Sequence, residues 1–262
     1  QGNSLNGLAE LADDVAKMKQ IMGLTPPSHP PSPAPPSPPS SPPPPVRYAL
    51  RTGSGYLSSS LSIDTGAPYS ITGWVECDSG TGCNWGDDNW AGRRNVLGTC
   101  CGTSRTYVDV YQGNVGFGVA NRANGGSISL SAVVDDWWFF AVTTDGTTVD
   151  GYLGDGDTVG TSFSISGGDS SPGVAFGALS QGTIQRHFPG FIDEFTYWNV
   201  KLTGEEVTAI SASASPDQLS FSSGLVSWWR FGEGDTYPTI ADKVGSNDLT
   251  MSGMDAEDII IL

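Results

Sequence analysis

Two pairs of neighbouring acids are the residues best suited to hydrolytic chemistry: Asp193 with Glu194, and Glu233 with Asp235. A retaining glycoside hydrolase needs two carboxylates that face one groove at a separation of about 5 Å. Strand alternation would send Asp193 and Glu194 to opposite faces of a sheet. The body holds one histidine, His187, and no G-x-S-x-G, so a Ser/His/Asp site has no support either. We therefore predict that the chain is not an enzyme.

An aromatic loop is the best candidate for sugar binding. Trp85 and Trp90 flank a polar run that includes Asp87 and Asn89. Lectin sites combine aromatic faces with a few polar groups, so we predict a carbohydrate-binding site at these four residues. The alternative is a loop that simply packs its tryptophans. The other six tryptophans occur in strand-like runs and are expected mostly in the core: Trp74, Trp137, Trp138, Trp198, Trp228 and Trp229.

The net charge argues against one class of partner. The 262 residues carry a formal charge of −16, with a pI of about 4.2, and the basic residues do not cluster. Nucleic acid would be repelled over most of the surface and is not an expected partner. No apolar run approaches the ~20 residues that cross a bilayer, so membrane insertion is not expected. We expect a soluble, secreted chain whose signal has been removed or was never included.

Four cysteines fall within 25 residues: Cys77, Cys83, Cys100 and Cys101. Oxidised, they allow three pairings, and we predict two local disulfide bonds. A zinc site is the weaker alternative, because the C-x5-C spacing followed by an adjacent pair does not match two zinc knuckles. Four unpaired thiols in a reducing compartment are the remaining alternative.

The N-terminal segment, residues 1–24, is predicted to contain an amphipathic helix. Ser4 could cap it, and apolar residues recur at steps of three and four. A helix of ~20 residues is marginal alone in water, so we expect the apolar seam to associate with copies of itself or with a partner. Packing on its own domain is the alternative. The seam consists of Leu8, Leu11, Val15, Met18 and Met22.

A proline-rich segment, residues 25–45, follows the predicted helix. Thirteen of its 21 residues are proline, so polyproline II is expected and the segment would act as a stiff spacer of up to ~60 Å. Its Ser-Pro phrasing resembles the hydroxyproline-rich glycoproteins of plant and algal walls, although a plain linker is equally compatible. No N-x-S/T sequon occurs, so any glycan would be O-linked or carried by hydroxyproline. The resemblance implies modification at Ser28, Ser32, Ser37, Pro31, Pro36 and Pro39.

The body, residues 46–262, is predicted to be all-β. Twelve short strand-like segments are separated by Gly, Asp, Asn and Ser. Alternation in "YSITGWV" and "DEFTYWN" indicates strands with one buried face, as in two packed antiparallel sheets. A jelly-roll antiparallel β-sandwich is the simplest closure.

A short helix is predicted directly after the strand "FPGFIDEFTYWN". Thr203 has the spacing of an N-cap with Glu206 three residues later, as in a capping box. Val207 and Ile210 would then face the sandwich.

This strand and helix resemble the closing motif of laminin-G-like modules in the concanavalin-A-like lectin and glucanase group. Further segments, "SLSIDTGAPYSITGWV", "DDWWFFAVTTDGTTVDGYL" and "VAFGAL", resemble that family in the proper order. The glucanases of the group carry E-x-D-x-x-E, which is absent here. The motif residues are Gly190, Ile192, Asp193, Glu194, Trp198, Asn199, Leu202, Thr203, Glu205, Glu206 and Val207.

The tail, residues 222–254, resembles the segment that begins such a module, and similar tails follow laminin-G-like modules of phage and algal-virus virion proteins. The tail would complete either its own sandwich, as in a circular permutation, or that of a neighbouring subunit. Laminin-G-like modules often hold a calcium ion, which implies Asp193, with Asp64 as second choice, as ligands. Solvated turn aspartates are the alternative.

Together these features predict a non-catalytic structural glycoprotein of the cell surface or virion surface. It would assemble into a homo-oligomer, array or filament through its N-terminal helix, and could also adhere to glycans. The rival hypothesis is a monomeric, calcium-dependent carbohydrate-binding lectin.

Overall fold

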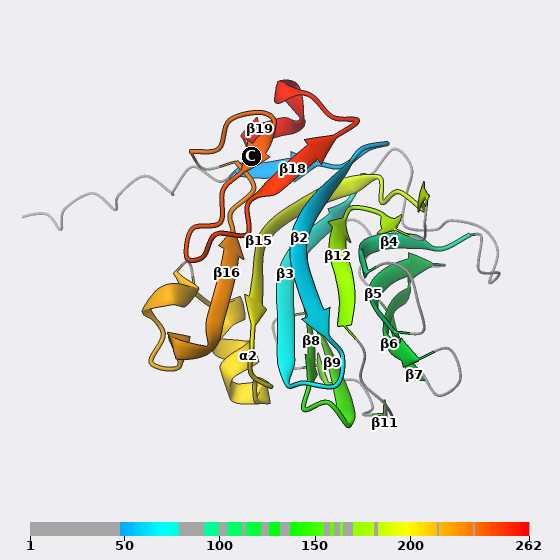
Figure 1. Cartoon of the computed structure of the whole chain (residues 1–262), viewed down its shortest axis with the longest axis vertical. Helices are drawn as coiled ribbons and strands as arrows, with labels where there is room; N and C mark the ends of the chain where they lie inside the picture. The colour runs from blue at the N-terminus through cyan, green and yellow to red at the C-terminus, as the bar shows by residue number, and fades with distance from the viewer. Residues whose placement is uncertain are drawn as a thin grey trace, which may run out of the picture. The chain divides into compact units, whose positions relative to one another are not determined.

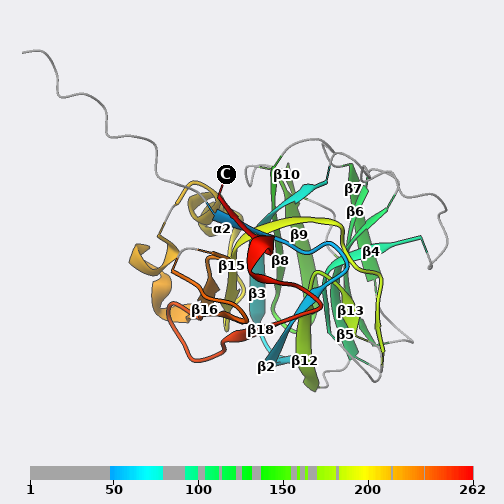
Figure 2. The same cartoon turned by 90° about the horizontal axis from the view of Figure 1, so that it is seen from above.

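A computed structural model shows two antiparallel β-sheets that face each other as a sandwich (Figures 1 and 2). The structure describes residues 48–78, 92–99, 104–111, 114–121, 126–131, 137–154, 158–159, 163–164, 170–180, 183–213, 215–232 and 234–261. All of them belong to one compact unit, residues 45–262. The predicted all-β jelly-roll sandwich is confirmed.

The first sheet, sheet A, follows the order β10-β9-β8-β3-β15-β1-β19, with β11 paired to β9 and β16 paired to β15. Its centre is β15, where Ile192 lies between Val75 of β3 and Leu50 of β1. The strands are β1 (Tyr48–Arg51), β3 (Tyr69–Cys77), β8 (Trp138–Thr144), β9 (Thr148–Leu153), β10 (Thr158–Val159), β11 (Phe163–Ser164), β15 (Gly190–Trp198), β16 (Leu225–Trp229) and β19 (Ile259–Ile261).

The second sheet, sheet B, follows the order β17-β18-β2-β12-β4-β5-β6-β7. Val108 of β5 lies between Leu97 of β4 and Phe117 of β6, and all three side chains enter the core. The strands are β2 (Tyr56–Asp64), β4 (Arg94–Thr99), β5 (Ser104–Tyr111), β6 (Asn114–Asn121), β7 (Gly126–Ser131), β12 (Ser170–Phe176), β17 (Thr239–Ile240) and β18 (Leu249–Ser252). A separate pair is formed by β13 (Leu179–Ser180) and β14 (Ile184–Gln185).

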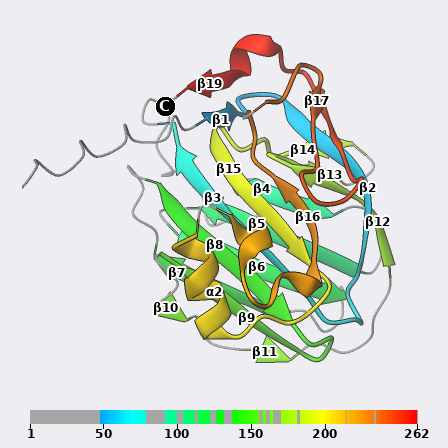
Figure 3. The ribbon, with the colours of Figure 1, turned by 90° about the vertical axis from the view of Figure 1, so that its left-hand side faces the viewer.

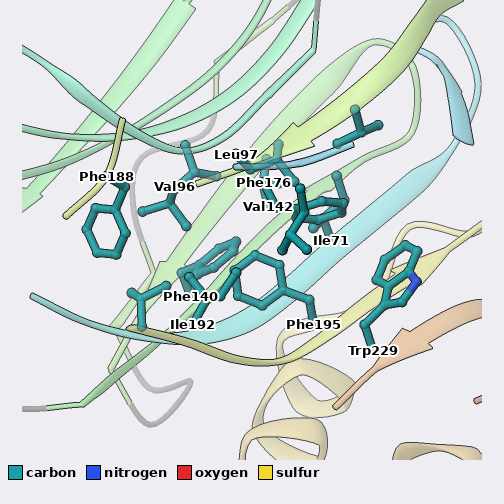
Figure 4. Packing of buried hydrophobic residues seen from close by; sticks show 14 of the residues in the cluster. Ile71, Val96, Leu97, Phe140, Val142, Phe176, Phe188, Ile192, Phe195 and Trp229 are labelled. Carbon is teal, nitrogen blue, oxygen red and sulfur yellow. The ribbon is translucent and has the colours of Figure 1, made fainter. Parts of the chain in front are cut away.

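Aromatic rings fill the core between the sheets (Figure 4). Phe195 meets Phe140 edge to face at 5.3 Å between ring centroids, and Phe176 meets Trp229 at 5.2 Å. Such edge contacts add to the stabilisation that burial of the rings provides. Gly73 is needed here, because a Cβ at that position would lie 2.1 Å from the Phe195 ring. The ring can therefore rest directly on the β3 backbone.

The tail supplies strands to both sheets of its own chain. Strand β16 pairs with β15 and β19 pairs with β1 in sheet A, while β18 pairs with β2 in sheet B. Two short helices in this region, η2 (Ser222–Gly224) and η3 (Ala256–Asp258), precede β16 and β19. The structure thus corresponds to the first of the two alternatives, in which the tail completes its own sandwich.

Two carboxylates hold the turns of this tail. Oδ1 of Asp242 accepts hydrogen bonds from the backbone N–H groups of Trp228 at 3.0 Å and Gly245 at 2.9 Å. Burial alone would raise the pKa of Asp242, but these bonds outweigh it and lower the pKa. Asp235 has a fully buried side chain and accepts from Lys243 Nζ at 2.9 Å. Asp235 and Asp242 therefore stabilise the turns of the tail through these contacts.

The predicted helix is confirmed as α2 (Gly204–Ser211), which lies on the outer face of sheet A in front of β8 and β9 (Figure 3). Thr203 and Glu206 form the expected reciprocal capping box, and Val207 and Ile210 are buried. With the following η1 (Pro216–Gln218), α2 covers a second apolar cluster outside the main core. This cluster contains Phe139, Ala141, Tyr152, Trp198, Leu202, Val207, Ile210, Leu225 and Trp228.

Candidate functional site

A polar cluster lies on the outer face of sheet B and begins on β5. Val108 and Val110 of this strand face the core. Because successive strand residues point to opposite faces, Tyr107, Asp109 and Tyr111 face away from the core. The sequence Y-V-D-V-Y therefore places one carboxylate between two tyrosines on the outer face.

Glycines in β6 give these side chains room. Gly116 lies opposite Asp109, and a Cβ there would be 2.2 Å from the Asp109 Oδ1 atom. Gly118 lies opposite Tyr107, and a Cβ there would be 2.0 Å from the tyrosine ring. Any larger residue would lift the two side chains off the sheet. The G-x-G spacing of β6 thus matches the Y-x-D spacing of β5.

Arg93, one residue before β4, completes the charged part of the cluster. Its Nη1 donates to Asp109 Oδ2 at 3.1 Å, and its guanidinium carbon lies 4.2 Å from the centroid of the Tyr111 ring. The Asp109 side chain is 1% exposed, whereas the Arg93 side chain is 17% exposed. Asp109 is thus the buried anchor of a guanidinium that reaches the surface over an aromatic ring.

Two buried acceptor atoms near the Arg93 side chain come from facing residues of β4 and β5. Asn95 of β4 is directly opposite Asp109, and neither Asn95 Oδ1 nor Asp109 Oδ1 has a hydrogen-bond partner. Burial raises the pKa of Asp109 to about 6, and the positive charges of Arg93 and Arg186 oppose this rise only in part. We refer to Arg93, Asn95, Tyr107, Asp109 and Tyr111 as the Arg93 cluster.

The exposure of the Arg93 cluster decides what it can do chemically. Asp109 and Asn95 are almost fully buried, so they position other groups and do not meet a ligand directly. Arg93 and Tyr111 are only half-buried. A guanidinium fixed on a ring can donate to hydroxyl or acid groups, and the ring offers an apolar face. This combination suits recognition of a polar molecule.

The predicted sugar-binding residues Trp85, Asp87, Asn89 and Trp90 lie outside the described residues. In the sequence, Trp90 precedes Arg93 by only three positions. Sequence reasoning missed the Arg93 cluster, although the facing patterns Y-V-D-V-Y and G-F-G were a usable signal. What was missing was the knowledge that these two strands are neighbours.

The first acid pair is arranged differently from the expectation. Ile192 and Phe195 both enter the core, and the pairing of β15 with β3 shifts register between Asp193 and Thr196. Glu194 has φ +52°, in the left-handed region. The prediction that Asp193 and Glu194 point to opposite faces is therefore wrong, because a β-bulge breaks the alternation at this point.

Both carboxylate oxygens of Glu194 accept hydrogen bonds at this bulge. Its Oε1 accepts from Arg230 Nε at 2.9 Å, and its Oε2 accepts from the indole N–H of Trp228. The guanidinium of Arg230 in turn lies 5.1 Å from the Trp228 ring centroid. In the second acid pair, Asp235 holds the tail, and Glu233 lies outside the described residues.

The two predicted calcium ligands lie in different sheets. Asp193 is buried in β15 opposite Trp74, whereas Asp64 is exposed at the end of β2 and accepts from the Gly66 N–H at 2.9 Å. In the part of the chain that the structure describes, no group of three or more His, Cys, Asp or Glu side chains could hold a metal ion. Calcium binding at Asp193, with Asp64 as the second choice, stays a prediction.

A second surface feature lies on sheet A beyond the part that α2 covers. Trp74 and Glu76 of β3 and Phe191 of β15 are half-buried, and Arg51 of β1 is exposed. The Arg51 guanidinium carbon lies 5.4 Å from the Phe191 ring centroid. We call these four residues the Trp74–Phe191 patch.

The prediction that most of the remaining tryptophans lie in the core is confirmed for Trp138, Trp198, Trp228 and Trp229, which are buried. Trp137 and Trp74 are half-buried.

Several predicted features lie outside the described residues: the helix with its seam of Leu8, Leu11, Val15, Met18 and Met22, the proline-rich segment with Ser28, Ser32, Ser37, Pro31, Pro36 and Pro39, and Cys83, Cys100 and Cys101. Cys77 ends β3 and takes part in a disulfide bond. Its pairing stays a prediction. Among the residues that can be described, no helix has the length and apolarity needed to cross a membrane.

Solved structures share this fold at low sequence identity. A protein from Bacteroides ovatus, to which carbohydrate binding has been ascribed, is 16% identical and aligns over 83% of this chain and 60% of its own, with a TM-score of 0.61. A heptameric SAP-like pentraxin from Limulus polyphemus is 12% identical over 79% of this chain and 95% of its own, with a TM-score of 0.50. Domains LG4-5 of the mouse laminin alpha1 chain are 14% identical over 58% of this chain and 41% of theirs, with a TM-score of 0.46.

The first two of these similarities establish the fold. The sandwich is a concanavalin-A-like jelly roll, so the resemblance to laminin-G-like modules is confirmed at the level of architecture. The chain spans 60% of the length of the Bacteroides protein. No protein-family model matches the sequence, and no curated protein matches it.

Proposed function

We propose that the sandwich is a non-catalytic module that binds glycans through the outer face of sheet B. Arg93 and Tyr111 would contact the ligand, with the guanidinium donating to sugar hydroxyl or acid groups and the ring packing on a sugar face. Asp109 would act as a positioning residue by holding Arg93 in place. The fold that this chain shares with a protein of ascribed carbohydrate binding supports the proposal without deciding it.

The observation that carries the proposal is the Arg93–Tyr111 stack. A partly exposed guanidinium is fixed 4.2 Å above an aromatic ring by a carboxylate that water does not reach. Such a preorganised donor and apolar face loses little conformational entropy when a ligand binds. Arg93 follows Trp90 by three positions in the sequence, and sugar binding at Trp85, Asp87, Asn89 and Trp90 stays a prediction.

The proposal that the module is non-catalytic is supported by the contacts that three of its carboxylates make. Hydrolysis needs a pair of carboxylates that reach the substrate. Within the described parts of the chain, Asp109 is buried under Arg93, Glu194 bonds to Trp228 and Arg230, and Asp235 holds Lys243. Each of these acids already has a structural partner.

A glycan array probed with the full chain tests this function. We expect binding to a restricted set of glycans, at least a tenfold loss of affinity in Tyr111→Ala, and no release of reducing sugar from the bound glycans. Tyr237→Ala is the matched control, since Tyr237 is a 49% exposed aromatic residue away from the cluster. An array without any bound glycan, or sugar release by the wild-type chain, would contradict the proposal.

The wider proposal is an extracellular, self-assembling glycoprotein in which this module is displayed. Residues 1–24 would associate, residues 25–45 would act as a spacer that can carry glycans, and the sandwich would provide adhesion. A monomeric calcium-dependent lectin is the rival. Mass photometry of the full chain against residues 46–262 separates the two: assembly predicts oligomers that are lost on truncation, while the rival predicts a monomer in both cases.

A further inference from the structure

The Trp74–Phe191 patch offers two aromatic rings on neighbouring strands. Phe191 lies opposite Glu76, and Trp74 lies opposite Asp193, so Phe191 and Trp74 are diagonal neighbours on the outer face of sheet A. Diagonal pairs lie about 7–8 Å apart, within reach of aromatic side chains, so the two rings can form one elongated aromatic surface. The patch therefore fits an extended chain better than a bulky surface.

Both rings are held in position from the side. Trp74 meets the buried Phe139 edge to face at 5.4 Å between centroids. Phe191 carries the guanidinium of Arg51 at 5.4 Å. Because neither ring has to be ordered when a partner binds, the patch is preorganised for binding.

The sequence contains a partner of matching chemistry. Residues 25–45 hold 13 prolines and no Asp, Glu, Lys or Arg. Polyproline II segments dock on aromatic-lined surfaces, because they are already extended and lose little entropy on binding. The chain has a net charge of −16, so two whole bodies repel each other, whereas the uncharged proline segment can approach without this repulsion.

The attachment point of the segment favours a second copy as its source. Only Val46 and Arg47 separate Pro45 from Tyr48, where β1 begins. A contact made by the prolines of another copy places no requirement on the path of these two residues.

We propose that the Trp74–Phe191 patch binds the proline-rich segment, residues 25–45, of a second copy of this chain. The contact joins two different surfaces, so each chain can offer its segment to one neighbour and its patch to another. Such a heterologous contact builds open filaments unless the geometry closes a ring. The inference rests on the assembly part of the proposed function and names the surfaces that assemble.

Analytical ultracentrifugation of the full chain tests the inference. Wild type is expected to associate with rising concentration, and excess synthetic peptide of residues 25–45 is expected to weaken this association at least tenfold. Phe191→Ala should weaken association by a similar factor, and Tyr237→Ala should leave it unchanged. A chain whose residues 25–45 are replaced by Gly and Ser of equal length should associate as weakly as Phe191→Ala and should no longer respond to the peptide, and this variant keeps both residues 1–24 and the sandwich.

The outcomes separate this inference from the function on which it rests. Association as strong in Phe191→Ala and in excess peptide as in untreated wild type would overturn the inference while leaving self-assembly in place. A wild-type chain that stays monomeric at every concentration would overturn both. Thermal unfolding of Phe191→Ala shows whether the variant is folded, and association of the Gly and Ser chain at wild-type strength would also overturn the inference.

Discussion

The outer faces of the two sheets use charge in opposite ways. On sheet B, the Arg93 cluster buries its carboxylate, and Asp109 is 0% exposed beneath a guanidinium that reaches the surface. On sheet A, the rings of the Trp74–Phe191 patch are half-buried and its cation, Arg51, is exposed. Substitutions in the Arg93 cluster should lower the free energy of unfolding, because the same residues serve the fold and the site. Substitutions in the Trp74–Phe191 patch should change it little.

This difference follows from what lies opposite each side chain. The Asp109 carboxylate packs against the backbone of Gly116, because this residue has no Cβ to prevent the contact. Phe191 lies between Arg51 and Glu76, whose long side chains keep it near the surface. A charged group that loses its water must be paired, whereas a half-exposed ring needs no partner.

The largest expected effect concerns the charge of Asp109. Its pKa is raised to about 6 in the folded protein, so the stability it contributes is present below the unfolded pKa, near 4, and is lost as the pH rises through 6. Relative to Asp109→Asn, the wild-type free energy of unfolding should fall by about 3 kcal/mol between pH 3 and pH 8. Urea unfolding at both pH values measures this difference. Parallel pH profiles of the two proteins would show that Asp109 is not desolvated.

The next largest loss of stability is expected at Glu194, in the part of sheet A outside the Trp74–Phe191 patch. Glu194→Ala leaves the indole N–H of Trp228, a residue 6% exposed, without its carboxylate acceptor. The free energy of unfolding should fall by about 2 kcal/mol, with no change in glycan binding. Chemical denaturation gives the first quantity and titration calorimetry the second. Wild-type stability in this variant would mean that the bulge is not held by Glu194.

A smaller effect is expected at the glycine beneath Asp109. Gly116→Ala introduces a Cβ 2.2 Å from Asp109 Oδ1, which must move and loosen its contact with Arg93. The free energy of unfolding should fall by about 1 kcal/mol, and glycan affinity should fall with it. An unchanged affinity would show that the position of Arg93 does not matter for binding.

The smallest effect on stability is expected at the patch. Phe191→Ala removes a ring that is already half in water, so the free energy of unfolding should change by less than about 1 kcal/mol. Thermal unfolding measures this. A loss comparable to that of a core phenylalanine would place Phe191 among the structural residues and remove the contrast between the two faces.

Local sequence signals explained the parts of the fold that depend on near neighbours. Thr203 and Glu206 are three positions apart, so their capping box could be predicted, and the strands β3 and β15 were expected where they occur. The expectation of one buried face was wrong for Tyr69 to Gly73 of β3, which are buried on both faces. The bulge at Asp193 and Glu194 could not be foreseen, because an extra residue in one strand is set by its partner strand. The Arg93 cluster was missed for the same reason, since it depends on the pairing of β4, β5 and β6.

Glycan affinity measured on a matched pair of variants tests the central claim most directly. With a glycan that binds the wild-type chain, Tyr111→Ala on sheet B should lose at least tenfold in affinity, while Phe191→Ala on sheet A should bind as wild type does. Equal affinity in Tyr111→Ala and wild type, with both variants folded, would contradict the assignment of the outer face of sheet B as the binding surface.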